Sequence, residues 1–170
     1  MQRIIVIGCC GCGKTTLSRE LASKLNLPLI HLDALNWRDN WQHVSQEEFD
    51  RLLSVEVKKN KWIIDGNYNR TIPIRLKYCD TIIYMDYPRL VCLFGAIKRI
   101  LKGYGKSRPD MGGNCPERFD MEFLRFIWNF NKNNRQKYLQ MLEEVVSEKK
   151  VILLRSRKEC LNFLQSFNSP

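Results

Sequence analysis

The sequence has little histidine and no long run of apolar residues. His31 and His43 are its two histidines, which argues against a histidine-rich metal site. No apolar stretch approaches the ~18–20 residues of a membrane span. The apolar run at the start turns into a glycine loop too early for a secretory signal peptide. We therefore expect a cytoplasmic protein without a membrane partner.

Acidic residues are scarce relative to basic ones. There are 28 Lys and Arg against 18 Asp and Glu, which gives a formal net charge of +10. Such an excess suits an anionic partner, whether nucleic acid, a membrane surface or small phosphorylated molecules, although a generally basic surface gives the same sum. Repeats and low-complexity tracts are absent as well, and we expect residues 1–170 to form a single domain.

The seven cysteines show no spacing of a disulfide framework, and we expect most of them to be free thiols. Three of them, Cys9, Cys10 and Cys12, crowd into the stretch "GCCGCGKTT" at residues 8–16. They lie too close together for a usual structural zinc site, and the sequence has no second closely spaced pair of Cys or His residues to complete one. We interpret them as small residues of a tight loop. A thiol there, beside a helix N-terminus, can have a lowered pKa and be open to oxidation.

Strands and helices are predicted to alternate along the chain. Short β-branched segments predict strands at 3–8, 28–33, 61–66, 81–86 and 149–155. Helices are predicted at 15–25, after Ser45, at 88–102, at 120–148 and after Ser156. This alternation predicts right-handed βαβ units. The expected fold is therefore α/β in three layers, with a five-stranded, mostly parallel sheet and helices on both faces.

The pattern Gly8-x-x-x-x-Gly13-Lys14-Thr15 is a complete phosphate-binding loop between a predicted strand and a predicted helix. Its glycines let backbone N–H groups turn toward phosphate oxygens, and the helix adds its positive N-terminus. Lys14 can reach the β- and γ-phosphates, and the Thr15 hydroxyl can bind Mg²⁺. The predicted nucleotide-binding residues are Gly8, Gly11, Cys12, Gly13, Lys14, Thr15 and Thr16. We expect ATP, because "NKNN" at 131–134 lacks the aspartate of the Asn-Lys-x-Asp motif for guanine.

Three carboxylates, Asp33, Asp65 and Asp86, end predicted strands. The carboxyl ends of parallel strands meet at one edge of a sheet, so these groups are expected near the phosphate loop. Acids there can order the waters of Mg²⁺ or take a proton from an attacking hydroxyl, while helix capping is the alternative. We favour the acceptor or base role for Asp33, the metal site for Asp65 and a structural role for Asp86.

The segment 102–118 is a candidate lid. It is rich in glycine, proline and basic residues and shows no periodic pattern, which is typical of a lid, a binding loop or disorder. Lid arginines can stabilise the charge that develops on a transferring phosphoryl group, although a solvated mobile loop explains the same charges. The candidates are Arg99 and Arg108, with Arg135 on the helix that returns from the lid.

The stretches "GCCGCGKTT" and "IIDGNYNRT" (63–71), followed by the basic lid, resemble the small kinases related to adenylate kinase. Asp65-Gly66 and Arg70-Thr71 resemble the Asp-Gly-x-Pro-Arg-Thr segment of nucleoside monophosphate kinases, whose arginine holds the acceptor phosphate. This implies substrate contacts for Asp65, Gly66 and Arg70. Here Asn67-Tyr68-Asn69 replaces a shorter Phe-Pro, so the arginine is offset by one residue.

A wider resemblance covers almost the whole chain. The segments "HLDALNW" (31–37), "WIIDGNYNRT" (62–71), "KSRPDM" (106–111), "CPERFD" (115–120) and "FIWNF" (126–130) resemble the bacterial DNA topology modulation proteins, often called FlaR-related. The residues and resemblances together imply an Mg²⁺-dependent kinase. It would transfer the γ-phosphoryl group of ATP to a nucleotide, a nucleoside or another small hydroxyl compound. A nucleotide-regulated DNA-binding protein without kinase activity and a plain NTP hydrolase are the alternatives.

Overall fold

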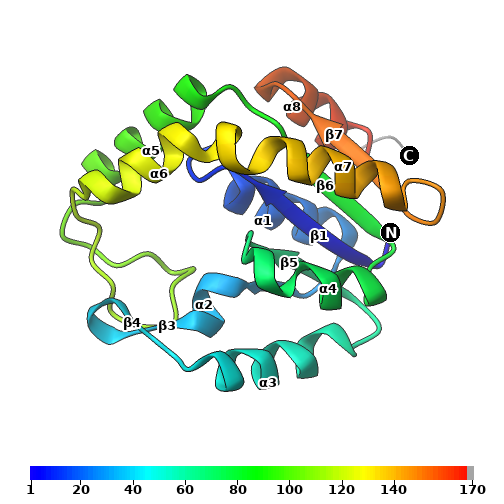
Figure 1. The fold of residues 1–170 in the computed structure, drawn as a ribbon, viewed down its shortest axis with the longest axis horizontal. Coiled ribbons are helices and arrows are strands. Elements are labelled where there is room, and N and C mark those ends of the chain that lie inside the picture. The colour runs from blue at the N-terminus through cyan, green and yellow to red at the C-terminus, as the bar shows by residue number, and fades with distance from the viewer. Residues whose placement is uncertain (168–170) are drawn as a thin grey trace.

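The computed structural model describes residues 1–167 and confirms the predicted α/β fold. One sheet has the strand order β2-β5-β1-β6-β7, and every neighbouring pair is parallel, where a mostly parallel sheet was expected. Its strands are β1 (Arg3–Gly8), β2 (Leu29–His31), β5 (Trp62–Asp65), β6 (Thr81–Met85) and β7 (Lys150–Leu154). Figure 1 shows helices in front of this sheet and behind it, so the sheet is the middle layer.

The three central strands form the core. In β5 and β6 every residue is buried, and in β1 every residue after Arg3 is buried. Continuous runs of Ile and Val are expected for strands that helices cover on both faces. The edge strands β2 and β7 are only partly buried. The central strand β1 therefore presents its carboxyl end, and the loop that follows, between two buried neighbours.

The helices begin where the sequence signals place them. Both predicted capping boxes form, because the Ser45 and Ser156 hydroxyls each accept a hydrogen bond from the amide three residues later. The helices are α1 (Lys14–Leu25), α2 (Leu32–Asn36), α3 (Gln46–Val57), α4 (Ile72–Tyr78), α5 (Arg89–Gly103), α6 (Met121–Phe130), α7 (Gln136–Val145) and α8 (Arg157–Gln165). No helix among residues 1–167 is long and apolar enough to cross a membrane.

Three details differ from the sequence prediction. The second strand ends at His31, so Asp33 lies in the first turn of α2 and not at a strand end. The single helix expected at 120–148 is divided into α6 and α7 by a π-helical turn at Asn131–Arg135. A small antiparallel pair, β3 (Trp37–Arg38) and β4 (Gln42–His43), was not predicted, because two-residue strands leave no periodic pattern.

The candidate lid is docked on the residues that follow Asp33. In Figure 1 the loop between α5 and α6 runs back to α2, β3 and β4. The Asn40 amide donates to the Asn114 carbonyl at 2.9 Å, and the Trp41 indole N–H donates to the Pro116 carbonyl at 3.1 Å. A Cβ on Gly112 would stand 2.2 Å from the Ala34 carbonyl oxygen, so glycine is needed for this close approach. The structure thus holds the lid against the α2–β4 segment.

Candidate functional site

The phosphate loop stands between β1 and α1, as its pattern requires. Gly13 is the N-cap of α1 with φ 102°, a conformation that side chains rarely adopt. Gly11 has φ 81°, and a Cβ there would lie 2.1 Å from the Cys92 carbonyl oxygen of α5. Glycine at position 11 therefore allows both the turn of the loop and its contact with α5. The Gly8 amide donates to the Asn67 side-chain oxygen at 3.0 Å.

Lys14 folds back over this loop. Its Nζ donates to the Cys9 carbonyl at 3.1 Å. Burial opposes its charge, but the neighbouring Cys12, Cys10 and Asp65 act in the other direction and raise the pKa of Lys14 above its usual value. Lys14 is therefore a protonated cation held beside the loop. Its Nζ could donate to a phosphate oxygen in place of the Cys9 carbonyl.

Thr15 and Asp65 meet at the end of β5. The Thr15 hydroxyl donates to Asp65 Oδ2 at 3.0 Å, and His31 Nδ1 lies 3.1 Å from the same oxygen. Asp65 Oδ1 is buried and has no hydrogen-bond partner. A buried carboxylate oxygen without a partner is costly unless a cation or water completes it. The oxygen donors fit Mg²⁺, which takes a carboxylate or hydroxyl together with waters and phosphate oxygens.

Cys9 and Cys12 of the phosphate loop are not acidic thiols. Burial raises the pKa of Cys12 to about 12. A hydrogen bond with Cys92, together with burial, raises the pKa of Cys9 as well. The sequence allowed a lowered thiol pKa at this helix N-terminus, but desolvation outweighs the helix dipole here. All seven cysteines are free, and no cluster of three His, Cys, Asp or Glu among residues 1–167 could hold a metal.

The Asn67-Tyr68-Asn69 turn connects three parts of the site. The Asn67 side-chain oxygen accepts a hydrogen bond from the Gly8 amide of the phosphate loop, and the Tyr68 hydroxyl donates to Asp33 Oδ1 at 2.8 Å. Asn69 donates to Asn134 at 3.0 Å and accepts from the Tyr138 hydroxyl. These residues stand where the sequence departs from the monophosphate-kinase pattern. That departure was the only signal of their role.

A fully buried arginine fixes this turn. Arg75 donates to the carbonyls of Gly66, Asn67 and Tyr68. Burial lowers the pKa of Arg75 to about 10, so it remains charged near neutral pH. Arg75 therefore lies beneath the turn and holds its backbone in place. The Gly66 carbonyl is likewise engaged with Arg75, and not turned toward a substrate.

Asp33 is the exposed carboxylate of the site, with 41% of its side chain accessible to solvent. It accepts the Tyr68 hydrogen bond, and its Oδ2 lies 3.8 Å from Arg108 Nη2 of the lid. Burial and the nearby Asp33 charge raise the pKa of Tyr68, so its hydroxyl stays protonated as a donor. The structure thus brings Asp33 and Arg108, two predicted site residues, to one place.

The lid arginines are paired with carboxylates of the lid itself. Glu117, 3% exposed, lies 2.9 Å from the Nε atoms of both Arg99 and Arg108, although neither N–H points at its oxygen. Asp110, 5% exposed, lies 2.9 Å from Arg108 and 3.4 Å from Arg19 of α1. Arg99 contacts Glu117 and the Phe123 ring, away from the phosphate loop's own contacts. In the sequence, Asp110 and Glu117 are the acids that oppose the positive charge of the lid, and the structure shows that they pair with its arginines.

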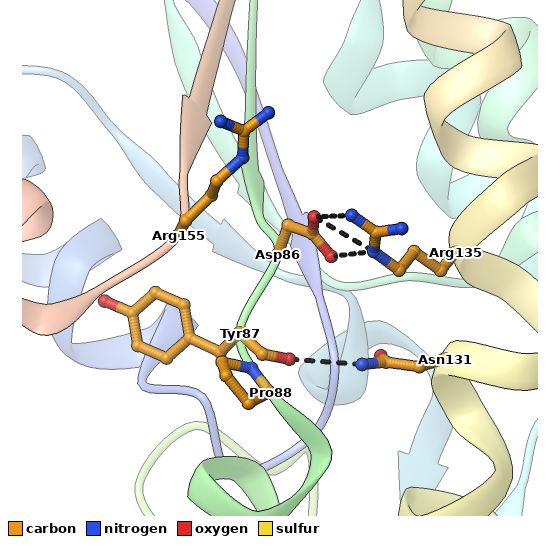
Figure 2. Close-up of a pocket in the computed structure, with 6 residues that line it drawn as sticks. All are labelled: Asp86, Tyr87, Pro88, Asn131, Arg135 and Arg155. Carbon is orange, nitrogen blue, oxygen red and sulfur yellow. Dashed lines mark hydrogen bonds and ion pairs between the residues drawn. The ribbon is translucent and has the colours of Figure 1, made fainter.

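Arg135 lines a separate pocket of about 260 Å³ at the carboxyl ends of β6 and β7. Figure 2 shows its guanidinium facing Asp86, with contacts of 2.8 to 3.1 Å, while Asn131 donates to the Tyr87 carbonyl. Arg155 reaches this pocket from the end of β7. Asp86 follows β6, the strand beside β1, so the pocket lies on the opposite side of the phosphate loop from Asp33.

Arg70 is turned away from the phosphate loop. It forms two hydrogen bonds of 2.7 Å with Asp50 of α3, and this pair lines a second pocket of about 340 Å³ beside α4. The hydrogen bonds from Arg70 hold the pKa of Asp50 below its usual value. The predicted contact of Arg70 with an acceptor phosphate therefore requires Asp50 to release it.

Known proteins resemble the chain at two levels. A sequence model of the ATPases associated with various cellular activities matches residues 4–72, which hold the phosphate loop, Asp33 and Asp65. This match covers less than half of the chain. No curated protein sequence matches it. The comparisons do not show the DNA topology modulation family, which remains a resemblance in the sequence.

Solved structures match over nearly the whole chain. A shikimate kinase from Bacteroides thetaiotaomicron is 20% identical over 98% of this chain and 96% of its own, with a TM-score of 0.51. A shikimate kinase from Acinetobacter baumannii, solved in complex with shikimate, is 14% identical over 99% and 91%, with a TM-score of 0.63. A kinase candidate from Chloroflexus aurantiacus is 17% identical over 97% and 95%, with a TM-score of 0.57. The chain therefore has the α/β fold of P-loop kinases.

Proposed function

We propose that the protein is an Mg²⁺-dependent kinase that transfers the γ-phosphoryl group of ATP to a hydroxyl group of a small molecule. The observation that carries this proposal is the buried, unpartnered Asp65 Oδ1 beside Thr15 at the end of the phosphate loop. A loop that bound phosphate without a cation would not need a buried carboxylate beside Thr15. A cation bound with the nucleotide gives that oxygen its partner.

The phosphate loop would hold the triphosphate through backbone amides of residues 9 to 16, whereas the Gly8 amide already donates to Asn67 and the Cys12 amide to the Cys9 carbonyl. Lys14 would leave the Cys9 carbonyl for the β- and γ-phosphates, and Thr15 and Asp65 would hold Mg²⁺, directly or through its waters. The metal would neutralise negative charge on the phosphate oxygens during transfer. The pocket beside Asp86 and Arg135, on the side away from Asp33, has room for part of the nucleoside.

Asp33 would orient the acceptor and take its proton. The acceptor hydroxyl oxygen attacks the γ-phosphorus, the hydroxyl proton passes to Asp33, and the bond to the β–γ bridging oxygen breaks, so ADP leaves. Arg108 is the lid arginine placed to neutralise developing charge, since it already lies 3.8 Å from Asp33. Arg99 supports Arg108 through their shared Glu117, and Arg135 acts from the nucleotide side.

The test is ADP release from Mg·ATP with Lys14→Ala and Asp33→Asn, beside the exposed control Lys61→Ala. Lys14→Ala should abolish acceptor-dependent release while the fold stays intact by circular dichroism. Asp33→Asn should lower kcat by at least ~10²-fold, the scale of general-base catalysis, with little change in ATP affinity. Full activity of Lys14→Ala would refute the role of the loop. ADP release that no acceptor accelerates would instead identify a plain NTP hydrolase.

A further inference from the structure

We propose that the phosphoryl acceptor is a neutral or cationic hydroxyl compound, and not a phosphate monoester or a carboxylic acid. This inference rests on the proposed kinase function and concerns the charge balance around Asp33. Binding an anion next to a carboxylate requires at least one cation that is free to pair with it. Each of the six arginines described below already has partners within the chain.

Arg108, the lid arginine beside Asp33, and its neighbour Arg99 carry no spare positive charge. Arg108 lies 3.8 Å from Asp33 and 2.9 Å from both Asp110 and Glu117. Arg99 contacts the same Glu117. Two arginines thus face three carboxylates, and the third cation, Arg19, lies at 3.4 Å from Asp110 with half of its side chain in solvent. The cluster around Asp33 is therefore neutral at most.

Three further arginines, on the segments that follow β2 and β5, are engaged in other contacts. Arg75 is buried under the 66–68 turn and donates to three carbonyls there. Arg70, which follows that turn, is bound to Asp50 by two hydrogen bonds. Arg38 contacts Glu48 and the carbonyls of Leu35 and Trp37. An anionic acceptor would have to separate one of these pairs and also lie beside Asp33.

A hydroxyl or amine suits the same place without such a rearrangement. Asp33 is an exposed acceptor of hydrogen bonds, and Tyr68 and Arg108 occupy only part of its capacity. A donor group of the substrate can complete Asp33, whereas a phosphate or carboxylate would meet it with like charge. An amine near the hydroxyl would gain from the same carboxylates. The arrangement around Asp33 therefore discriminates between acceptors by their charge, whatever their shape.

The experiment compares acceptors that differ mainly in charge, by ADP release from Mg·ATP. The sets are glycerate, glycerol and serinol; shikimate and its methyl ester; and nucleoside monophosphates and their nucleosides. In each set, the neutral or cationic compounds should have a kcat/KM at least ~10-fold higher than the anionic compounds. If an anionic member leads, the kinase proposal stands and this inference is overturned. If no member raises the rate, the kinase proposal fails, and this inference with it.

A variant provides a second measurement. Asp50→Asn releases Arg70 at an exposed position, where the substitution leaves the core untouched. It should raise kcat/KM for the anionic members by about 10-fold and leave the neutral members unchanged. The matched control is Glu20→Gln, an exposed carboxylate of α1. If Asp50→Asn gives the anionic members no advantage over the control, the pairing of arginines is not what excludes anions, and the inference is overturned.

Discussion

At the scale of single residues, Tyr68 is the least expected member of the site. Its backbone adopts φ 37° and ψ 65°, in the left-handed region that residues other than glycine seldom occupy. Arg75 holds the carbonyl of this residue, and the Phe49 ring stacks on its ring at 5.0 Å. A strained residue that the surroundings hold in place is often part of a functional site. Its hydroxyl uses this fixed position to reach Asp33.

We expect Tyr68→Phe to lower kcat about 10-fold, because Asp33 loses the donor that orients it. The free energy of unfolding should change by only about 1 kcal/mol, since the ring keeps its stacking on Phe49. Steady-state kinetics should show the loss in kcat with KM for ATP unchanged. An unchanged kcat would contradict the role.

At the scale of elements, α5 is placed by a glycine-to-glycine contact with the phosphate loop. A Cβ on Gly95 would lie 2.1 Å from the Gly11 carbonyl oxygen, and a Cβ on Gly11 would lie 2.7 Å from the Ala96 amide nitrogen. The loop is therefore in direct backbone contact with the first half of α5. Since α5 leads into the lid, the same contact couples the lid arm to the loop.

Two substitutions in α5 separate this contact from ordinary helix propensity. Gly95→Ala should destabilise the fold by about 1–3 kcal/mol, because the added Cβ meets backbone and α5 or the loop must shift. Gly103→Ala is the control, because its Cβ would meet only the Glu117 side chain, at 3.5 Å, and alanine favours helix by about 1 kcal/mol. Chemical denaturation of both variants measures the difference. Equal effects would show that the contact with Gly11 is not limiting.

A second element contact is sensitive to pH. Burial would raise the pKa of Asp80, but hydrogen bonds from Thr81 and from the amides of Gln2 and Arg3 outweigh it and lower the pKa. The folded pKa is thus below the unfolded one, so the stabilisation is present above about pH 4 and is lost as pH falls through the folded pKa. Asp80→Asn should cost about 1–2 kcal/mol at pH 7, and this cost should shrink as pH falls through the folded pKa of Asp80. Denaturation across this range tests it, and a constant difference would be inconsistent.

At the scale of the whole molecule, the lid is docked by charge as well as by shape. Glu117 and Asp110 are buried between Arg99, Arg108 and Arg19, and they connect the lid to α5 and to α1. A buried carboxylate that loses its charge leaves its cations uncompensated, which costs about 3–5 kcal/mol when one partner of a pair is removed. Because the lid is a surface segment, we expect this cost to open the lid before it unfolds the core.

We expect Glu117→Gln to make the 104–118 segment at least ~10-fold more sensitive to trypsin at Lys106 and Arg118, since Arg108 precedes Pro109 and its bond resists trypsin. Global unfolding should change much less, since the sheet does not depend on this contact. Mass spectrometry of the first fragments would locate the cleavage. Glu122→Gln, an exposed acid at the start of α6, serves as the control. Cleavage at the wild-type rate would mean that Glu117 does not hold the lid.

The sequence by itself determined the five strands of the main sheet, the Ser45 and Ser156 helix caps, the phosphate loop, and the acids that belong near it. These follow from local rules: hydrophobic period, glycine positions and caps depend on neighbours within a few residues. It also indicated the lid through composition. It misplaced Asp33 at a strand end, because a three-residue strand followed by a helical turn has no signature of its own.

Only the tertiary structure decided which charges are free. Arg70, Arg99, Arg108 and Arg135 look alike in the sequence, yet Arg70 pairs with Asp50, Arg135 pairs with Asp86, and Arg99 and Arg108 share Glu117. Some of these pairs join residues that are far apart in the sequence, as Asp86 and Arg135 are. The pairing depends on distances of a few ångströms, which no local sequence pattern encodes. The same holds for Tyr68 and Asp33, which meet because parallel strands bring successive loops to one edge of the sheet.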